Sequence, residues 1–190
     1  MVIEVLIPAA GNATRMRGFP KFLLPSGFEN YTLLELHLKA ASEITQDISI
    51  AINPIFYELI MTASLRTFGA VVVPMKTETM NETVLKMIKN SNSDRFMVTM
   101  PDTVFVGENP YVKLSEVKSD LHLGLWQIRN DQLGKLGQVQ INENKQVIDC
   151  VDKDLACNYP YIWGVQVFGK KYIKYLNAND PHIGLSLIHI

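Results

Sequence analysis

Four short apolar runs alternate with helical segments over the first hundred residues, and this order constrains the fold more than any other feature of the chain. The runs have the length and continuous apolarity of buried strands: Val2–Ile7, Ile48–Ile52, Ala70–Val73 and Phe96–Met100. Three helices are predicted between them, from Thr32 to about Ile44, from Asn53 to about Phe68 and from Thr79 to about Lys89. A β-α-β-α-β-α-β order requires a mostly parallel sheet with right-handed crossovers.

Capping signals support the predicted helices. Thr32 and Glu35 have the spacing of a capping box, and Thr79 and Glu82 repeat it. Gly69 is the expected stop of the second helix, because glycine adopts the left-handed conformation at a helix C-terminus at little cost.

The second half of the chain is richer in β-structure. Strands are predicted at Leu121–Ile128, Gly137–Ile141, Gln146–Val151 and Ile162–Phe168, followed by a short helix from about Lys170 to Leu176. The middle two strands flank an Asn-Glu-Asn-Lys turn, as in a hairpin. We therefore predict an α/β fold with a mostly parallel Rossmann-like sheet and a β-rich second half that closes over it. We expect one domain over residues 1–190, with halves of about 1–105 and 106–190.

Composition excludes several classes of protein. Of the 190 residues, 47% are hydrophobic and 19% are charged, which is typical of a globular protein and not of a disordered one. The net charge is −1 without a dense Lys/Arg tract, so we expect no nucleic-acid partner. The N-terminal apolar stretch is about seven residues long, too short for a signal peptide or a membrane span. Cys150 and Cys157 lack metal-ligand spacing, so we expect reduced thiols and a cytoplasmic location.

The loop after the first strand has the composition of a phosphate-binding turn. It reads Ala9-Ala10-Gly11-Asn12-Ala13-Thr14-Arg15 and is followed by Pro20-Lys21. Neither the P-loop pattern nor the GxGxxG pattern is present. Small side chains nevertheless let backbone amides approach phosphate oxygens, while Arg15 offers a planar fork of donors and Lys21 a compact charge. The alternative is an ordinary strand-to-helix turn with two solvated cations.

Asp102 comes directly after the fourth apolar run. Ligands of open α/β sheets bind outside the carboxyl ends of the strands, where both this aspartate and the first loop are expected. A carboxylate there is a plausible ligand for Mg²⁺, although a turn or capping role also explains it. The four histidines are scattered and give no support to serine, cysteine or zinc hydrolase chemistry. His37, in the first predicted helix, is expected to pack or to lie on the surface.

These segments resemble the sugar-phosphate nucleotidyltransferase superfamily, whose opening motif reads roughly LAAGxGTRLxxxxxPKxLLP. The matching positions are Ala9, Ala10, Gly11, Thr14, Arg15, Pro20, Lys21, Leu23, Leu24 and Pro25. The resemblance implies a fold of glycosyltransferase-A type whose first half binds the nucleotide through residues 9–14. It places Arg15 on the triphosphate at the reacting centre and Lys21 on the phosphates. It also implies that Asp102 binds the catalytic Mg²⁺.

In the second half the resemblance implies a sugar-phosphate site. Gly137 corresponds to a glycine whose backbone meets the sugar, Asp152-Lys153 to a Glu-Lys pair near the sugar phosphate, and Gly164 to the glycine that opens the last strand. Many members of the family have a second metal-binding aspartate in this half. Here the only aspartate left for it is Asp180, whose sequence context does not match. We therefore expect this half to be incomplete.

Two further departures concern the first half. Ala13 replaces a glycine, at a cost on the order of 1 kcal/mol if the position requires a positive φ. Pro101 replaces the glycine before the metal aspartate.

The resemblance implies transfer of a nucleotidyl group from a nucleoside triphosphate to a sugar 1-phosphate, giving a nucleotide sugar and pyrophosphate. One alternative is a cytidylyltransferase that acts on a non-sugar phosphate, of the methylerythritol-phosphate or phosphocholine type. Another is a nucleotide-binding module without turnover. The base, the acceptor and a homo-oligomeric state stay open at this point.

Overall fold

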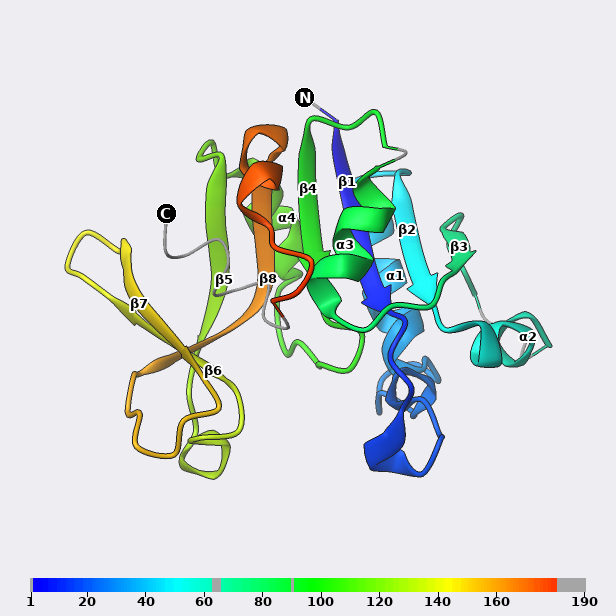
Figure 1. Cartoon of the computed structure of the whole chain (residues 1–190), viewed down its shortest axis with the longest axis horizontal. Coiled ribbons are helices and arrows are strands. Elements are labelled where there is room, and N and C mark those ends of the chain that lie inside the picture. The colour runs from blue at the N-terminus through cyan, green and yellow to red at the C-terminus, as the bar shows by residue number, and fades with distance from the viewer. Residues whose placement is uncertain (1, 63–65, 90, 181–190) are drawn as a thin grey trace.

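In the computed structural model of the chain, residues 2–62, 66–89 and 91–180 are described, without the side chains of Arg15 and Thr62. Within them one eight-stranded sheet forms the centre of the molecule (Figure 1). Its strands are β1 Ile3–Ala9, β2 Ile48–Ile52, β3 Val71–Pro74, β4 Arg95–Thr99, β5 Leu121–Gln127, β6 Gly137–Ile141, β7 Val147–Asp152 and β8 Tyr161–Gly169. The helices are α1 Leu33–Ser42, α2 Pro54–Thr62, α3 Met80–Ile88 and α4 Pro110–Glu116. Short 3-10 helices occur at Thr14–Met16, Lys21–Leu23, Asn130–Gln132 and Lys170–Tyr175.

The strand order confirms the predicted α/β class. The sheet runs β3-β2-β1-β4-β8-β6-β7, and β5 also pairs with β8. Strands β3, β2, β1 and β4 are parallel, whereas β8 is antiparallel to β4 and starts the β-rich half. Because β1 and β4 are parallel neighbours, the turn after β1 and the loop after β4 emerge at the same edge of the sheet.

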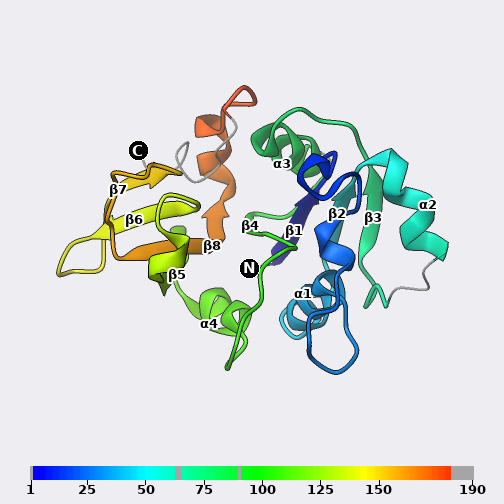
Figure 2. The ribbon, with the colours of Figure 1, turned by 90° about the horizontal axis from the view of Figure 1, so that it is seen from below.

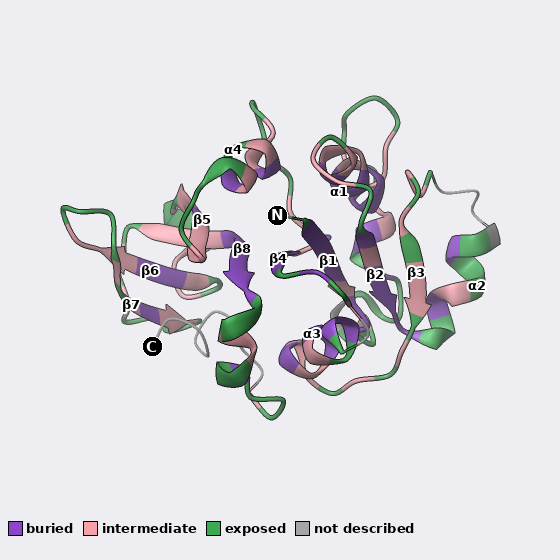
Figure 3. Cartoon of the chain, turned by 90° about the horizontal axis from the view of Figure 1, so that it is seen from above, coloured by how far each residue is buried: buried purple, intermediate pink, exposed green. Residues whose placement is uncertain are grey.

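Helices cover both faces of the parallel half, which explains why its strands are continuously apolar. Figures 2 and 3 show α1 and α4 on one face and α3 with the 170–175 helix on the other. Leu34 and Leu38 of α1 pack on Ile7 of β1 in one core. On the other face, Val84 of α3 packs with Leu6 of β1 in a second core.

The first predicted capping box forms in full. Thr32 Oγ1 accepts from the Glu35 amide at 3.2 Å, and a Glu35 carboxylate oxygen accepts from the Thr32 amide at 2.8 Å. At α3, Thr79 caps the Glu82 amide, but the Glu82 carboxylate accepts from the Glu78 amide instead of closing the box. Helices α1 and α3 therefore begin where the sequence predicts.

The predicted extension of the second helix to Phe68 is wrong. Residues 66 and 67 are not helical, and Phe68 and Gly69 form a turn with φ values of 50° and 83°. Residues 63–65 lie outside the described residues. The Arg66 amide and its guanidinium both donate to Glu35 on α1, at 3.0 Å each. This tertiary contact takes Arg66 out of the helical path.

Helix α4 was not predicted. Asn109 accepts from the Tyr111 amide at 2.9 Å and Pro110 occupies the first turn, so this helix starts with an Asn-Pro pair like that of α2. In the second half the hairpin is confirmed as the antiparallel pair β6–β7, with the expected Asn-Glu-Asn-Lys turn. The predicted closing helix is a 3-10 helix.

Candidate functional site

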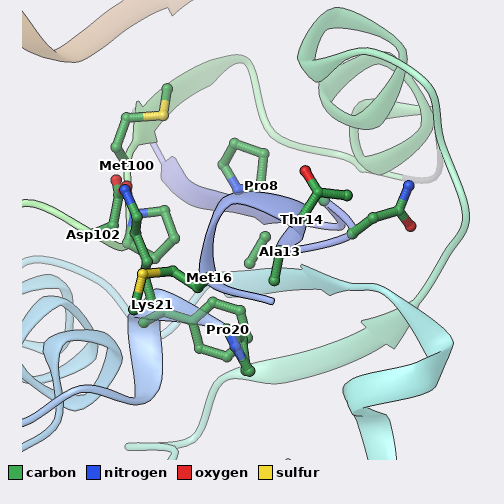
Figure 4. A pocket seen from close by; sticks show the side chains of 13 residues that line it. Pro8, Ala13, Thr14, Met16, Pro20, Lys21, Met100 and Asp102 are labelled. Carbon is green, nitrogen blue, oxygen red and sulfur yellow. The ribbon is translucent and has the colours of Figure 1, made fainter. Parts of the chain in front are cut away.

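A cavity of about 380 Å³ lies at the carboxyl edge of β1 and β4. It is lined by residues 8–9, 11–14, 16, 20–22 and 100–102 (Figure 4). Three separate segments thus meet here: the turn after β1, the 3-10 helix Lys21–Leu23, and the loop after β4. The first and last meet because β1 and β4 are parallel neighbours in the sheet.

The turn after β1 places consecutive backbone amides at the cavity. Within the described part of the chain, the amides of Gly11, Asn12, Ala13 and Thr14 donate no hydrogen bond. The amides of the following residues, 16 to 19, are all used inside the turn. Unpaired amides in a tight turn are the donors that bind phosphate oxygens.

Ala13 has the strained backbone that its glycine-like position suggested. Its φ is 52° and its ψ is 29°, in the left-handed region. Its carbonyl accepts from the amides of Met16 at 3.0 Å and Gly18 at 3.1 Å, which closes the turn. Alanine costs on the order of 1 kcal/mol more than glycine in this conformation. Arg15 lies in the 3-10 helix of this turn, but its side chain is outside the described part of the structure.

Asn53 anchors the turn from the neighbouring strand, a role that sequence reasoning missed. It follows β2 and is 4% exposed. Its Nδ2 donates to the backbone oxygen of Ala10 at 3.1 Å and to Asn12 Oδ1 at 2.8 Å. Its Oδ1 accepts from the amide of Ile55 and caps α2. The signal was the position of this capping asparagine at the end of the strand next to β1.

Lys21 and Asp102 face each other at the cavity, as Figure 4 shows. Lys21 Nζ lies 3.9 Å from Asp102 Oδ2, and both side chains are almost half exposed. The pair therefore places one cation and one carboxylate at the wall, both accessible to a ligand. Carboxylate oxygens are hard ligands, and Mg²⁺ in phosphoryl-transfer sites is commonly held by one or two carboxylates together with substrate phosphates. Asp102 fits this chemistry.

His37 lies beneath the Asp102 loop and is buried, at 1% exposure. Its Nε2 lies 2.9 Å from the backbone oxygen of Thr103, and its Nδ1 lies 2.5 Å from the Tyr111 hydroxyl. Burial lowers the pKa of His37 to about 4, although the Thr103 carbonyl and Asp102 favour the protonated form. The imidazole is therefore neutral at pH 7.

A comparison with protein families identifies the family of this chain. Residues 5–122 match the MobA-like NTP transferase domain, and this range contains every residue that lines the cavity. The chain belongs to the MobA-like NTP transferase family. A nucleotidyltransferase family was expected from the opening motif, and the match confirms it. Comparison with curated proteins gives no significant match.

Solved structures with the same fold include other transferases. A putative glucose-1-phosphate thymidylyltransferase from Bacillus anthracis, in complex with sucrose, aligns with a TM-score of 0.75 and 18% identity over 95% of this chain and 76% of its own. A UDP-glucose pyrophosphorylase complexed with UDP-glucose aligns at 0.72 with 15% identity, covering 100% and 86%. An inositol-1-phosphate CTP transferase from T. maritima aligns at 0.67 with 18% identity, covering 90% and 72%. At these identities the likeness shows the shared nucleotidyltransferase fold.

The four second-half residues predicted to bind a sugar phosphate are not among the residues that line the cavity in this family member. For two of them the structure shows a packing requirement. A Cβ added to Gly137 would lie 2.7 Å from Trp163 Nε1, and one added to Gly164 would lie 2.9 Å from the Trp126 ring. Both glycines make room for an indole.

The other two form a pair next to Gly137. Lys153 Nζ lies 3.2 Å from Asp152 Oδ2, and Gly137 pairs with Asp152 across the β6–β7 ladder. Lys153 has a φ of 52°, which turns the chain away from β7. Asp180 lies in a polar turn, where its amide donates to the Asn177 oxygen at 3.0 Å. Among the described helices, none combines the length and apolarity of a bilayer-spanning segment.

Proposed function

We propose that this chain transfers a nucleotidyl group from a nucleoside triphosphate to the phosphate of a sugar 1-phosphate and releases pyrophosphate. The observation that carries the proposal is the arrangement at the cavity. Four residues with unpaired backbone amides, together with Lys21 and Asp102, line one cavity at the carboxyl edge of the sheet. Membership in an NTP transferase family supports the same reaction.

The reaction needs charge control more than acid–base catalysis. An anionic oxygen of the acceptor phosphate attacks the α-phosphorus, the bond from that phosphorus to the β-phosphate oxygen breaks, and pyrophosphate leaves. No proton has to be removed from the nucleophile, so the site requires no general base. The amides of residues 11–14 and Lys21 would orient the triphosphate and neutralise the negative charge that accumulates during the transfer.

Mg²⁺ is part of the proposal, with Asp102 as its protein ligand. When bound by Asp102, the ion would supply positive charge that stabilises the negative charge of the phosphates during the transfer. We propose that Arg15 acts on the triphosphate at the reacting centre and that Lys153, with Asp152 and the backbone of Gly137 and Gly164, acts on the acceptor. These roles follow from the resemblance of the sequence motifs.

The test is a matrix of nucleoside triphosphates and acceptor phosphates, followed by pyrophosphate release with Mg²⁺. We expect one triphosphate to react with one hexose 1-phosphate far faster than the other pairs. Absence of pyrophosphate release from every pair, with nucleotide binding intact by calorimetry, would favour a binding module without turnover.

A cytidylyltransferase that acts on a non-sugar phosphate is the second candidate. The likeness to an inositol-1-phosphate CTP transferase favours it, since the same fold carries a non-sugar acceptor in that protein. The matrix therefore includes CTP with inositol 1-phosphate, methylerythritol phosphate and phosphocholine. Turnover restricted to one of these three pairs would identify a non-sugar phosphate, and not a sugar 1-phosphate, as the acceptor.

A further inference from the structure

The loop that carries Asp102 is attached to α1 through a buried histidine. His37 Nε2 lies 2.9 Å from the backbone oxygen of Thr103, the residue that follows Asp102. Because a carbonyl oxygen can only accept, Nε2 carries the proton and donates this hydrogen bond. Thr103 also bonds through its hydroxyl to the Met100 oxygen at 3.1 Å, which closes the turn of residues 100–103. Asp102 lies within this closed turn.

The tautomer fixed by the Thr103 oxygen decides the role of the opposite ring nitrogen. With the proton on Nε2 of a neutral imidazole, Nδ1 is an acceptor, and the Tyr111 hydroxyl 2.5 Å away donates to it. Tyr111 lies on α4 and is fully buried, and a hydrogen bond of 2.8 Å joins it to Thr99 at the end of β4. Two helices and the strand that precedes Asp102 therefore share one network.

Aromatic packing holds the loop at a second point. Phe105 meets the edge of His37 with ring centroids 5.0 Å apart and stacks on Trp126 at 5.2 Å and 16°. Leucine at position 37 would fill this core without the cost of burying an imidazole. It would not supply an N–H for the Thr103 oxygen.

On the basis of the proposed nucleotidyl transfer, we infer that His37 is a positioning residue that sets the Asp102 carboxylate in the cavity through the backbone of Thr103. His37 does not touch the substrate. Of its contacts with this loop, the hydrogen bond to the Thr103 oxygen is the one that requires an N–H group at one point in space. Partners that orient a metal ligand in this way typically change metal affinity by about 10- to 100-fold when they are removed.

Two amide substitutions form a matched pair that tests this effect. His37→Gln places a neutral N–H donor about where Nε2 lies, whereas His37→Asn has the same chemistry but falls short of Thr103. Leu38→Ala serves as the control for core damage, because Leu38 is the next residue of α1, equally buried, and absent from the network.

The main readout is the affinity for Mn²⁺, measured by electron paramagnetic resonance with the α,β-methylene analogues of UTP, dTTP and CTP. We expect His37→Asn to weaken Mn²⁺ binding by about tenfold or more and to lower kcat, and His37→Gln to restore both to within about threefold of the wild type. Leu38→Ala should lower Tm while Mn²⁺ affinity stays unchanged. Equal Mn²⁺ affinity in the two amide variants overturns the inference.

His37→Leu covers the case in which His37→Asn does not fold. Leucine fills the core but supplies no N–H for the Thr103 oxygen. Weaker Mn²⁺ binding in His37→Leu than in His37→Gln supports the role of His37, and equal binding contradicts it.

Hydrogen exchange of residues 100–106 separates this inference from the proposed function. If the wild type releases no pyrophosphate and binds no Mn²⁺–nucleotide, the proposed function fails. The role of His37 is then tested on the loop without metal. Faster exchange in His37→Asn than in His37→Gln supports it, and equal exchange overturns it.

Discussion

Lys21 Nζ and Asp102 Oδ2 lie 3.9 Å apart, although the two residues are 81 positions apart in the chain. The pair joins the segment after the β1 turn to the loop after β4. Almost half of the surface of each side chain is exposed and accessible to a ligand. The charges of this pair complement those of a polyphosphate–metal complex, whose phosphates are negative and whose metal ion is positive.

Replacing Lys21 should lower turnover strongly. Lys21→Met removes a cation from the cavity, and we expect kcat/KM to fall on the order of a hundredfold, as for the loss of one electrostatic donor. Pyrophosphate release under Mg²⁺ measures the change. Lys39→Met is the matched control, because Lys39 forms a similar exposed pair with Glu29 but lies away from the cavity. Equal losses in the two variants would contradict the role of Lys21.

Arg15 is expected to act on the reacting phosphate, a prediction that rests on its place in the opening motif. Arg15→Ala should reduce kcat on the order of a thousandfold while Tm and nucleotide affinity change little. Arg17→Ala tests a neighbouring arginine that is exposed and lies in the same turn. A rate for Arg15→Ala within the range of Arg17→Ala would remove Arg15 from the reaction.

The hydrogen bond from Asn53 to Asn12 should matter for nucleotide binding. Asn53→Ser keeps a capping oxygen for α2 but cannot reach the turn after β1, so we expect KM for the triphosphate to rise roughly tenfold with little loss of stability. Thr32→Ala removes the cap of α1 and should cost about 1 kcal/mol without changing KM. The turn would be independent of Asn53 if KM were equal in Asn53→Ser and the wild type.

Stability should decrease as the pH falls below neutrality. Burial lowers the pKa of His37 from 6.5 to about 4. Between these pH values the unfolded chain binds a proton that the folded chain does not. The free energy of unfolding therefore falls as the pH drops, by about 3 kcal/mol in total.

Glu35 extends the effect to lower pH. Burial alone would raise its pKa, but hydrogen bonds from Arg66 and Thr32 lower it to about 2. Its stabilising contribution is lost as the pH falls from 4.5 toward 2. Urea unfolding at about pH 7 and about pH 4.5 checks the histidine part, since His37→Gln should lose most of the change in this window. An unaltered pH dependence in that variant would assign the effect to other groups.

Gly137 is required by the indole beside it. Gly137→Ala would place a Cβ 2.7 Å from Trp163 Nε1, and we expect a loss of roughly 1 to 3 kcal/mol in the free energy of unfolding. Adding Trp163→Phe should recover part of this loss, because the smaller ring lacks the five-membered edge. Gly11→Ala is the control: its added Cβ would meet nothing within 4 Å, so stability should hold. Additive losses in the double variant would exclude the clash.

The sequence was sufficient for the sheet and most of its helices, because their determinants are local. An apolar run such as residues 48–52 specifies a buried strand by itself, and the Thr32–Glu35 box starts α1 through groups three residues apart. Sequence reasoning failed at two helices for different reasons. Arg66 leaves the helical path of α2 through contacts with the distant Glu35. Helix α4 is too short for its periodicity to be recognised.

The same division holds at the site. The turn after β1, Lys21 and Asp102 could be chosen from the sequence because small residues, cations and carboxylates have their chemistry wherever they lie. That they share one cavity depends on β1 and β4 being parallel neighbours.

Tertiary structure alone decided the roles of Asn53 and His37. Apart from the Ile55 amide that Asn53 caps, the hydrogen-bond partners of these two side chains lie at least 41 positions away in the chain, and a single side chain gives no sign of such distant partners. Local hydrogen bonding and periodicity are encoded in short stretches of sequence. Hydrogen bonds between segments exist only after the chain has buried its apolar surface, and they decide which polar groups support the site.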